Sequence, residues 1–255
     1  MTTIDGEATD RTTGRRARLN RDAVLRRAVE LADAESLDAV SMRRLAGELD
    51  VVPMALYKHV SGKDDLTTGM LDLVVRGIAH GDDDTGLPAS SVDGEPDPWR
   101  SALRRRILAA RASLLEHPWA LAVIESSTTP TPAVLDYIEG TIALFLNGGF
   151  SAGLTHQLMH ALGSRLWGFT HELFPTPPPA SADEAAAAAA QLADRYPCIL
   201  RIADAAHHGR DTILGPGCDD QYEFEFTLDL LLDGFEARRA AERRDATPRD
   251  VQPKA

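Results

Sequence analysis

Basic residues gather near the start of this sequence, where they could bind a polyanion. Residues 11–27 contain seven arginines and one acid, Asp22, which gives this stretch a local charge of +6. Residues 64–255 carry 16 basic and 29 acidic residues, within a chain whose net charge is −12. This average excludes a protein that binds nucleic acid over its whole surface. A basic head on an acidic body indicates either a small nucleic-acid-binding module or a solubilising charged tail.

Two pairs of histidines are the next residues that could do chemistry. His156 and His160 are four residues apart, so a helix would place both on one face, at a spacing that can hold a metal ion. No acidic residue completes an HExxH motif, and we expect no metal site and no cofactor. His207 and His208 fit a solvated loop better than a site.

The motifs of several enzyme classes are missing. The chain has no GxSxG nucleophile elbow, no GxGxxG motif and no phosphate-binding GKS/T loop. Its two cysteines, Cys198 and Cys218, argue against a disulfide framework or a thiolate zinc site and favour a reducing cytoplasm. No apolar run approaches the roughly 20 residues of a membrane span, and residues 1–10 are too polar for a signal peptide. We therefore expect no membrane partner and no enzyme. The alternative, a helical small-molecule-binding protein or enzyme without a DNA-dependent function, stays open.

Helical periodicity dominates the sequence and predicts an all-α fold. Signals for a helix N-terminus open four helices in the first 80 residues, namely Asn20, Ser41, Pro53 and the pair Ser61 and Asp64. The third of these is expected to end at about His59. Residues 81–98 are acidic and rich in Gly, Pro and Ser, which predicts a linker. Further helices are expected from Pro98, from Thr131 to Gly148 and from Ser151 to about Phe174.

Apolar spacing predicts which faces of the later helices point inward. One stripe holds Leu103, Ile107, Ala110 and Leu114, and a second holds Val134, Ile138, Ile142 and Phe145. Residues 219–244 alternate like a strand between Tyr222 and Leu230, but their length favours a helix. The predicted organisation is a disordered basic arm (1–17), a three-helix DNA-binding domain (18–80), a linker (81–98), a larger helical domain for ligand binding and dimerisation (99–245) and a disordered tail (246–255).

The first helices have the pattern of a helix-turn-helix. Ala46 is small where two helix backbones must approach, Val51 fits the turn as a core residue, and Leu56 and Val60 anchor the third helix. A helical subdomain without a DNA role has the same spacing. The pattern leaves six residues free to face a major groove: Val52, Pro53, Met54, Tyr57, Lys58 and His59.

The stretch SMRRLAGELDVVPMALYKHVSGKDDL resembles the DNA-binding signature of the TetR (tetracycline repressor) family, xxxLAxxLGVxxxxLYxHVxxKxxL. The matching residues are Ser41, Leu45, Ala46, Leu49, Val51, Leu56, Tyr57, His59, Val60, Lys63 and Leu66. Asp50 replaces the usual turn glycine, and aspartate tolerates a left-handed backbone. A second stretch, from Trp99 through Asn147–Ser151 to Trp167 and Gly168, is similar to the C-terminal domain of the tetracycline repressors.

The resemblance implies a homodimeric regulator of transcription, by family default a repressor that a small molecule releases from a palindromic duplex DNA operator. The expected DNA contacts are Ser41, Met42, Arg43, Val52, Pro53, Met54, Tyr57, Lys58, His59 and Lys63. The expected pocket for a largely apolar effector is Arg106, Ile107, Ala110, Leu114, Tyr137, Thr141, His156, His160 and Trp167. The expected dimer interface is a four-helix bundle of residues 151–173 and 219–240 from both chains. Its apolar stripes are Leu154, Leu158, Leu162 and Phe169, and Phe224, Leu228, Leu231 and Phe235.

Overall fold

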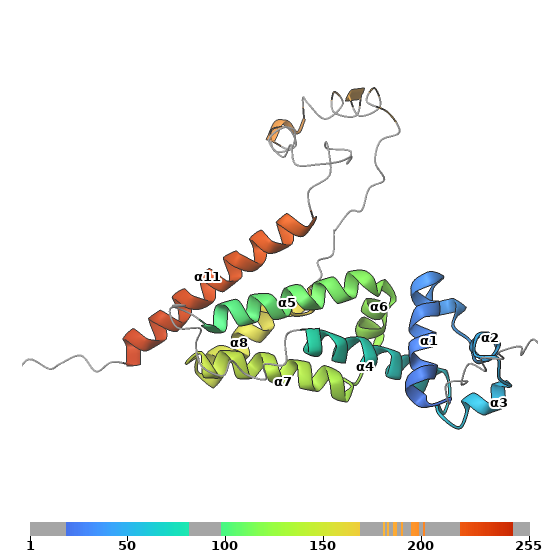
Figure 1. Ribbon diagram of the computed structural model, residues 1–255. Coiled ribbons are helices and arrows are strands. Elements are labelled where there is room, and N and C mark those ends of the chain that lie inside the picture. The colour runs from blue at the N-terminus through green and yellow to red at the C-terminus, as the bar shows by residue number, and fades with distance from the viewer. Residues whose placement is uncertain are drawn as a thin grey trace, which may run out of the picture. The chain divides into compact units, whose positions relative to one another are not determined.

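The computed structural model describes residues 19–81, 98–168 and 220–246, together with single positions between 181 and 201. All regular elements in these ranges are helical, so the predicted all-α fold is confirmed (Figure 1). The chain divides into two compact units, Met1–Met70 and Leu71–Ala255. Several predicted features lie outside the described residues. They are the arginines before Leu19, Phe169, His207, His208, and nearly all of the predicted linker and tail.

No single helix in the described part of the chain is long and apolar enough to cross a membrane. Helices α5 (Pro98–Glu116) and α6 (Pro118–Ser126) are long and apolar enough only when they are taken together, and the pair is bent by 106°.

The first unit contains α1 (Arg21–Ala34), the short η1 (Leu37–Ala39), α2 (Met42–Glu48), α3 (Pro53–Leu56) and the start of α4 (Lys63–Gly81). The predicted N-caps are confirmed: the Asn20 side chain accepts from the Ala23 N–H at 2.8 Å, and Ser41 accepts from the Arg44 N–H at 3.2 Å. Pro53 lies in the first turn of α3, where a missing N–H is harmless.

The turn between α2 and α3 is tight and left-handed at one residue. Asp50 has a φ of 52°, which confirms that aspartate adopts the conformation usually given to glycine. The Val51 N–H donates to the Ala46 carbonyl at 2.9 Å and closes the turn. Ala46 and Leu56 are buried behind it, whereas Val51 is half-buried.

Helix α3 is shorter than predicted, because it ends at Leu56 rather than at about His59. The Lys58 and His59 N–H groups donate to the carbonyls of Ala55 and Leu56, three residues back, so the chain tightens out of the α-helical pattern. Tyr57, Lys58 and His59 therefore form a turn, and Val60 is buried directly after it.

The predicted pairing of Ser61 with Asp64 is wrong by one residue. The Asp65 carboxylate accepts from the Ser61 N–H at 2.7 Å and from the Ser61 hydroxyl at 3.2 Å. The Leu66 N–H donates to Gly62, so the helix begins one residue later than the sequence suggested. Asp65 is therefore the third residue of the helix. In a capping box this is the residue whose side chain bonds to a backbone N–H before the helix.

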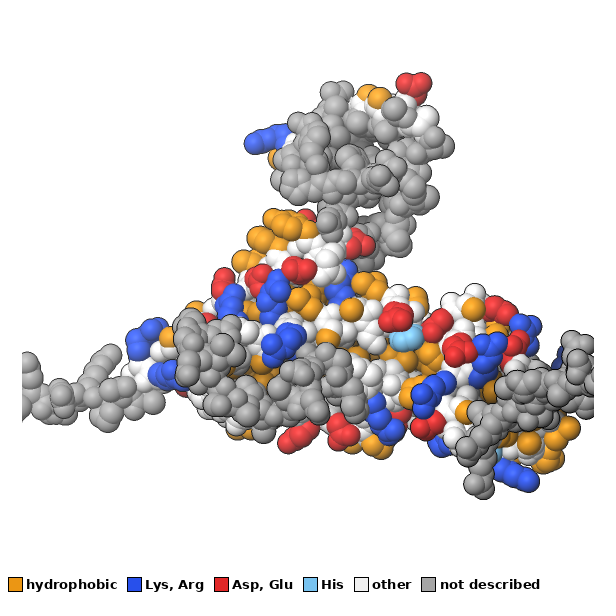
Figure 2. Space-filling model, viewed as in Figure 1, with side chains coloured by type: hydrophobic (Ala, Val, Ile, Leu, Met, Phe, Trp, Pro, Cys, Tyr) orange, Lys and Arg blue, Asp and Glu red, His pale blue; other side chains and the backbone are white. Residues whose placement is uncertain are grey.

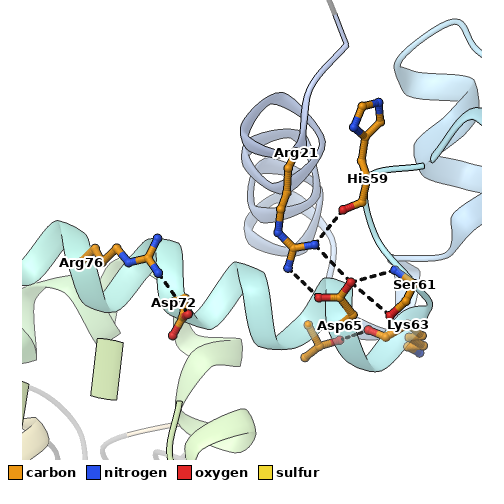
Figure 3. Close-up of polar contacts among 8 residues, drawn as sticks. Arg21, His59, Ser61, Lys63, Asp65, Asp72 and Arg76 are labelled. Carbon is orange, nitrogen blue, oxygen red and sulfur yellow. Dashed lines mark hydrogen bonds and ion pairs between the residues drawn. The ribbon is translucent and has the colours of Figure 1, made fainter. Parts of the chain in front are cut away.

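Arg21 joins three segments of the first unit (Figure 3). Its guanidinium donates to both Asp65 carboxylate oxygens, at 2.6 and 3.1 Å, and to the His59 carbonyl oxygen at 2.7 Å. This bond from Arg21, assisted by the Ser61 N–H, holds the pKa of Asp65 well below its usual range. The pair of Arg21 and Asp65 thus joins three segments: the start of α1, the turn after α3 and the first turn of α4.

The second unit contains the rest of α4, α5 (Pro98–Glu116), α6 (Pro118–Ser126), α7 (Pro132–Asn147), α8 (Ala152–Leu162), the short η2 (Gly163–Trp167) and α11 (Asp220–Ala246). The predicted caps Thr131 and Ser151 accept from the N–H groups of Val134 and Leu154, and the predicted inward stripe of α5 is buried. Helix α6 was not predicted: Pro118 starts a new helix directly after the bend at His117.

Two details of this unit differ from the prediction, and the helix expected over residues 219–244 is confirmed. On α7 the buried residues include Tyr137, Thr141 and Leu144, whereas Ile138 and Ile142 are half-buried. Helix α8 ends at Leu162 rather than at about Phe174, because Gly163 has a φ of 46° that breaks the helix. The strand alternative for residues 219–244 is excluded, because α11 is a continuous helix.

Ion pairs join α11 to α5. The two helices cross obliquely in Figure 1. Arg104 bonds Glu225 at 2.6 Å and Asp229 at 2.9 Å, and Arg100 bonds Asp233 at 2.6 Å. The bond with Asp229, followed by that with Glu225, raises the pKa of the Arg104 guanidinium. These contacts cover about one turn of α5 and about two turns of α11, and so fix the position of one helix against the other.

The Asp65 network predicts a pH-dependent contribution to stability. Replacing Asp65→Asn removes the charged acceptor, and we expect the free energy of unfolding at pH 7 to fall by about 1 kcal/mol, because both partners are partly exposed. A carboxyl whose pKa is lowered by folding stabilises above the unfolded-state value of about 3.9 and loses that contribution as the pH falls further. Thermal unfolding should therefore show a difference in the free energy of unfolding between the native chain and the variant. This difference should be constant above about pH 5 and become smaller below about pH 4.

The matched control is Asp64→Asn, which removes an exposed carboxylate one residue away. Asp64 makes no recorded side-chain bond with any described residue, so we expect a smaller effect. Equal losses in the two variants would contradict the assigned role of Asp65.

Candidate functional site

Large apolar side chains lie exposed on the segment around α3. Val52 is 68% exposed, Met54 72% and Tyr57 49%, although the unit has a well-packed core behind them. Apolar and basic side chains gather over this part of the first unit (Figure 2). An exposed apolar group beside free cations suits a surface that contacts base edges and phosphates.

The basic side chains among the described residues of this unit fall into two classes. Arg21, Arg26, Arg27 and Arg44 are each paired with a carboxylate at 2.5–3.6 Å. Arg27 also holds the pKa of the Glu48 carboxyl below its ordinary value, mainly through a hydrogen bond. Within residues 19–70, the cations that have no recorded carboxylate partner are Arg43, Lys58 and Lys63, and all three are exposed.

These three free cations are the three that the sequence pattern predicts at DNA. A phosphate can meet them without breaking an ion pair of the fold, whereas contact with the paired arginines would compete with a carboxylate. Ser41 is exposed beside Arg43, and its hydroxyl accepts from Arg44, which leaves the hydroxyl hydrogen to donate elsewhere.

The ten residues expected at DNA all lie in the first unit. They occupy the start of α2, helix α3, the turn after it and the first residue of α4. All are exposed except Met42 and His59, which are half-buried. The residue that sequence reasoning missed is Arg21, whose bond to the His59 carbonyl supports the turn; its position among seven arginines concealed this role.

Part of the expected effector pocket forms a polar and aromatic cluster in the second unit. Arg106 donates from Nε to the Thr141 hydroxyl at 3.1 Å and from Nη2 to the Tyr137 carbonyl at 2.9 Å. The Tyr137 ring lies 4.3 Å from the Arg106 guanidinium carbon and stacks on Trp167 at 4.6 Å between centroids. Its hydroxyl donates to the Leu166 carbonyl at 2.7 Å. The expected apolar members Ile107, Ala110 and Leu114 are buried on α5.

The other expected pocket members lie elsewhere. His156 and His160 are exposed on α8 and have no recorded contact with the Arg106 cluster within the described residues.

Sequence reasoning also missed Gly140: a Cβ there would lie 2.9 Å from Arg106 Nη2. A glycine inside a helical pattern is the signal that indicates such a close approach.

A groove of about 450 Å³ lies between α8 and α11. Leu154 and Ala161 line it from α8, and Leu230, Leu231 and Gly234 from α11. The predicted dimer stripes are only partly available to a second chain, because Leu158, Leu162, Phe224, Leu228 and Phe235 are already buried in the unit. Leu154 and Leu231 are half-buried, and Leu230 is 56% exposed.

Comparisons with known proteins cover most of the chain. The model of the tetracyclin repressor-like C-terminal domain matches residues 93–239. HTH-type transcriptional repressor DrrR1 of Streptomyces coeruleorubidus is 30% identical over 251 residues, which cover 92% of this chain and 84% of that protein. Tetracycline repressor protein class D of Escherichia coli is 27% identical over 88% of this chain and 93% of that protein.

A solved structure agrees with these relatives. The crystal structure of a possible TetR family transcriptional regulator from Streptomyces coelicolor A3(2) has a TM-score of 0.62 and 27% identity, and covers 86% of this chain and 99% of that chain. The domain match spans more than half of the sequence, and the exposed helix-turn-helix face is the part that such regulators need. The protein therefore belongs to the TetR family of transcriptional regulators.

Proposed function

We propose that this chain is a homodimeric repressor that binds a palindromic duplex DNA operator and is released by a largely apolar small molecule. The observation that carries the DNA-binding part is the division between paired and free cations in the first unit. A regulator of this kind acts where the DNA lies, which in a bacterium is the cytoplasm. Catalysis has no part in this proposal.

The residues of the exposed face take different tasks at DNA. Lys63 and the hydroxyls of Ser41 and Tyr57 suit phosphate oxygens, which fix the register of the protein on the duplex. His59 serves as a further phosphate contact. Arg43 and Lys58 suit the acceptor atoms of guanine in the major groove. Val52, Pro53 and Met54 offer apolar contact with thymine methyl groups, and Met42 supports them from the start of α2.

A second copy of the chain is needed for useful specificity. Helix α3 has four residues and reads few base pairs, so a two-fold partner must place a second copy about 34–36 Å away along the duplex. The groove between α8 and α11, with Leu230 exposed at its side, supports a four-helix interface built from these two helices of both chains.

The effector is proposed to bind at the Arg106 cluster. The guanidinium and the Thr141 hydroxyl offer polar contacts beside the stacked Tyr137 and Trp167, and the buried apolar residues of α5 lie on the same helix as Arg106. Helix α4 contains residues of both units, so a ligand that moves it changes the separation of the two recognition helices. A hundredfold loss of DNA affinity requires about 2.7 kcal/mol of differential binding.

Removing two phosphate-binding side chains should weaken DNA binding without unfolding the protein. In the double variant Tyr57→Ala, Lys63→Ala, we expect the affinity for the region upstream of the chain's own gene to fall at least about tenfold. The slope of log affinity against log salt should become shallower by about 1, because one fewer phosphate charge is neutralised when Lys63 is removed. Gel shifts across a salt series measure both quantities.

Arg76→Ala provides the control, because it removes one positive charge that is paired with Asp72 in the second unit. It should leave the affinity nearly unchanged. Unaltered affinity and salt slope in the double variant would show that this face does not bind DNA.

The proposed interface predicts the mass in solution. We expect light scattering at micromolar concentration to give twice the chain mass of 27.6 kDa for the native protein. Leu230→Glu places a charge on the interface and should shift the equilibrium towards 27.6 kDa. Leu115→Glu alters an equally exposed leucine on α5, outside the groove, and should remain dimeric. A native chain that scatters as a monomer would refute the proposal.

The effector site can be tested with tetracycline, which the name of one relative suggests, and with a panel of apolar polycyclic compounds. A true effector should raise the unfolding temperature, since a ligand at 100 times its dissociation constant adds about 2.7 kcal/mol, and should lower operator affinity. Thr141→Val removes one polar group from the cluster and should weaken both responses. Thr155→Val removes a buried hydroxyl on α8 that has no hydrogen-bond partner among the described residues, and should leave both intact. A panel in which no compound produces both responses would contradict effector release.

A further inference from the structure

His156 and His160 form an exposed pair of imidazoles that neither the DNA face nor the effector cluster uses. They lie one turn apart on α8, with ring centroids 4.7 Å apart and ring planes at 81°. Both side chains are exposed, and neither has a recorded hydrogen bond or ion pair in the described structure. Their ring nitrogens are therefore available to an external partner.

The spacing of the two rings fits chelation of one ion. A metal–nitrogen distance of about 2.0–2.1 Å, with a further distance of about 1.1 Å to the ring centre, places an ion about 3.2 Å from each centroid. Nitrogen–metal–nitrogen angles between about 90° and 110° then separate the centroids by about 4.5–5.2 Å. The observed 4.7 Å lies within this range.

The backbone beneath the pair is rigidly supported. Helix α8 is capped by Ser151, which accepts from the Leu154 N–H at 3.1 Å, and is anchored by the buried residues Leu158 and Leu162. Successive residues advance by about 100° around an α-helix, so the two histidines lie about 40° apart. The middle of the groove face of α8 lies about 100° or more away from them, so the groove and the histidine pair are separate surfaces.

The chemistry of the pair selects a class of ion. Imidazole nitrogens suit Zn²⁺, Ni²⁺ and Cu²⁺, whereas Mg²⁺ and Ca²⁺ require oxygen ligands. Helix α8 contains no acidic residue, and no third His, Cys, Asp or Glu joins the pair among the described residues. Water would fill the remaining coordination positions.

We infer that His156 and His160 chelate one divalent transition-metal ion per chain on the outer face of α8. The sequence alone predicts no metal here, whereas the 4.7 Å spacing of two exposed rings on an anchored helix supports one. The four-residue spacing is held only while α8 is helical, so the ion binds the folded chain in preference to the unfolded one and stabilises it.

The test uses the full chain freed of metal with a chelator, and NiCl₂ as the probe. Calorimetric titration should show a binding event whose affinity falls at least tenfold in His156→Gln and also in His160→Gln, because chelation needs both rings. Ni²⁺ should raise the unfolding temperature of the native chain and raise it less in either variant. His117→Gln changes a half-buried histidine at the bend between α5 and α6, and should keep the native response.

Equal Ni²⁺ affinity in the native chain and in the double variant His156→Gln, His160→Gln would overturn the inference, since the ion would then bind elsewhere. Both histidines are exposed, so circular dichroism without metal should show that the variants fold as the native chain does. Operator affinity measured in the presence of chelator is a separate readout, and its result bears on the proposed function alone.

Discussion

The Arg21 guanidinium is the group on which the proposed DNA-binding surface depends. A helix of four residues has no stability of its own, because nucleation is unfavourable and few hydrogen bonds follow. Helix α3 and the turn after it are therefore held from behind, by the buried Leu56 and Val60 and by the bond from Arg21 to the His59 carbonyl. The Asp65 carboxylate holds the Arg21 guanidinium in place through two hydrogen bonds. The position of the exposed face therefore depends on α1, which carries Arg21, and on α4, which carries Asp65.

Charge is distributed so that an acidic chain can still bind a polyanion. The net charge of −12 opposes DNA at long range, but a Debye length of about 8 Å at physiological salt limits that repulsion to nearby groups. The charges within that distance of the DNA then decide whether the chain binds it. Arg27 and Arg44 are neutralised within the fold, whereas Arg43, Lys58 and Lys63 have no carboxylate partner among the described residues and are the proposed phosphate and base contacts. The same side-chain type thus serves stability in one place and recognition in another, according to its nearest carboxylate.

Local features were predictable from the sequence, and features set by distant contacts were not. Asn20, Ser41, Thr131 and Ser151 cap helices as predicted, because a cap bonds to a backbone group three residues away. The inward face of α7 was misassigned because Arg106, 31 residues from Tyr137, bonds to that side of the helix. The proposed DNA contacts come from a resemblance of known spacing and stay a prediction, whereas the exposure of His156 and His160 depends on which face of α8 packs against the unit.

Hydroxyl-radical footprinting of the full chain on the DNA upstream of its own gene tests whether a dimer reads a palindromic operator through α3. We expect two protected tracts related by a two-fold axis, with centres one helical turn of about 10–10.5 base pairs, or a multiple of it, apart. Protection should persist when unrelated DNA is present in excess. A single protected tract, or protection that unrelated DNA abolishes, would contradict a dimer that reads a palindromic operator through α3.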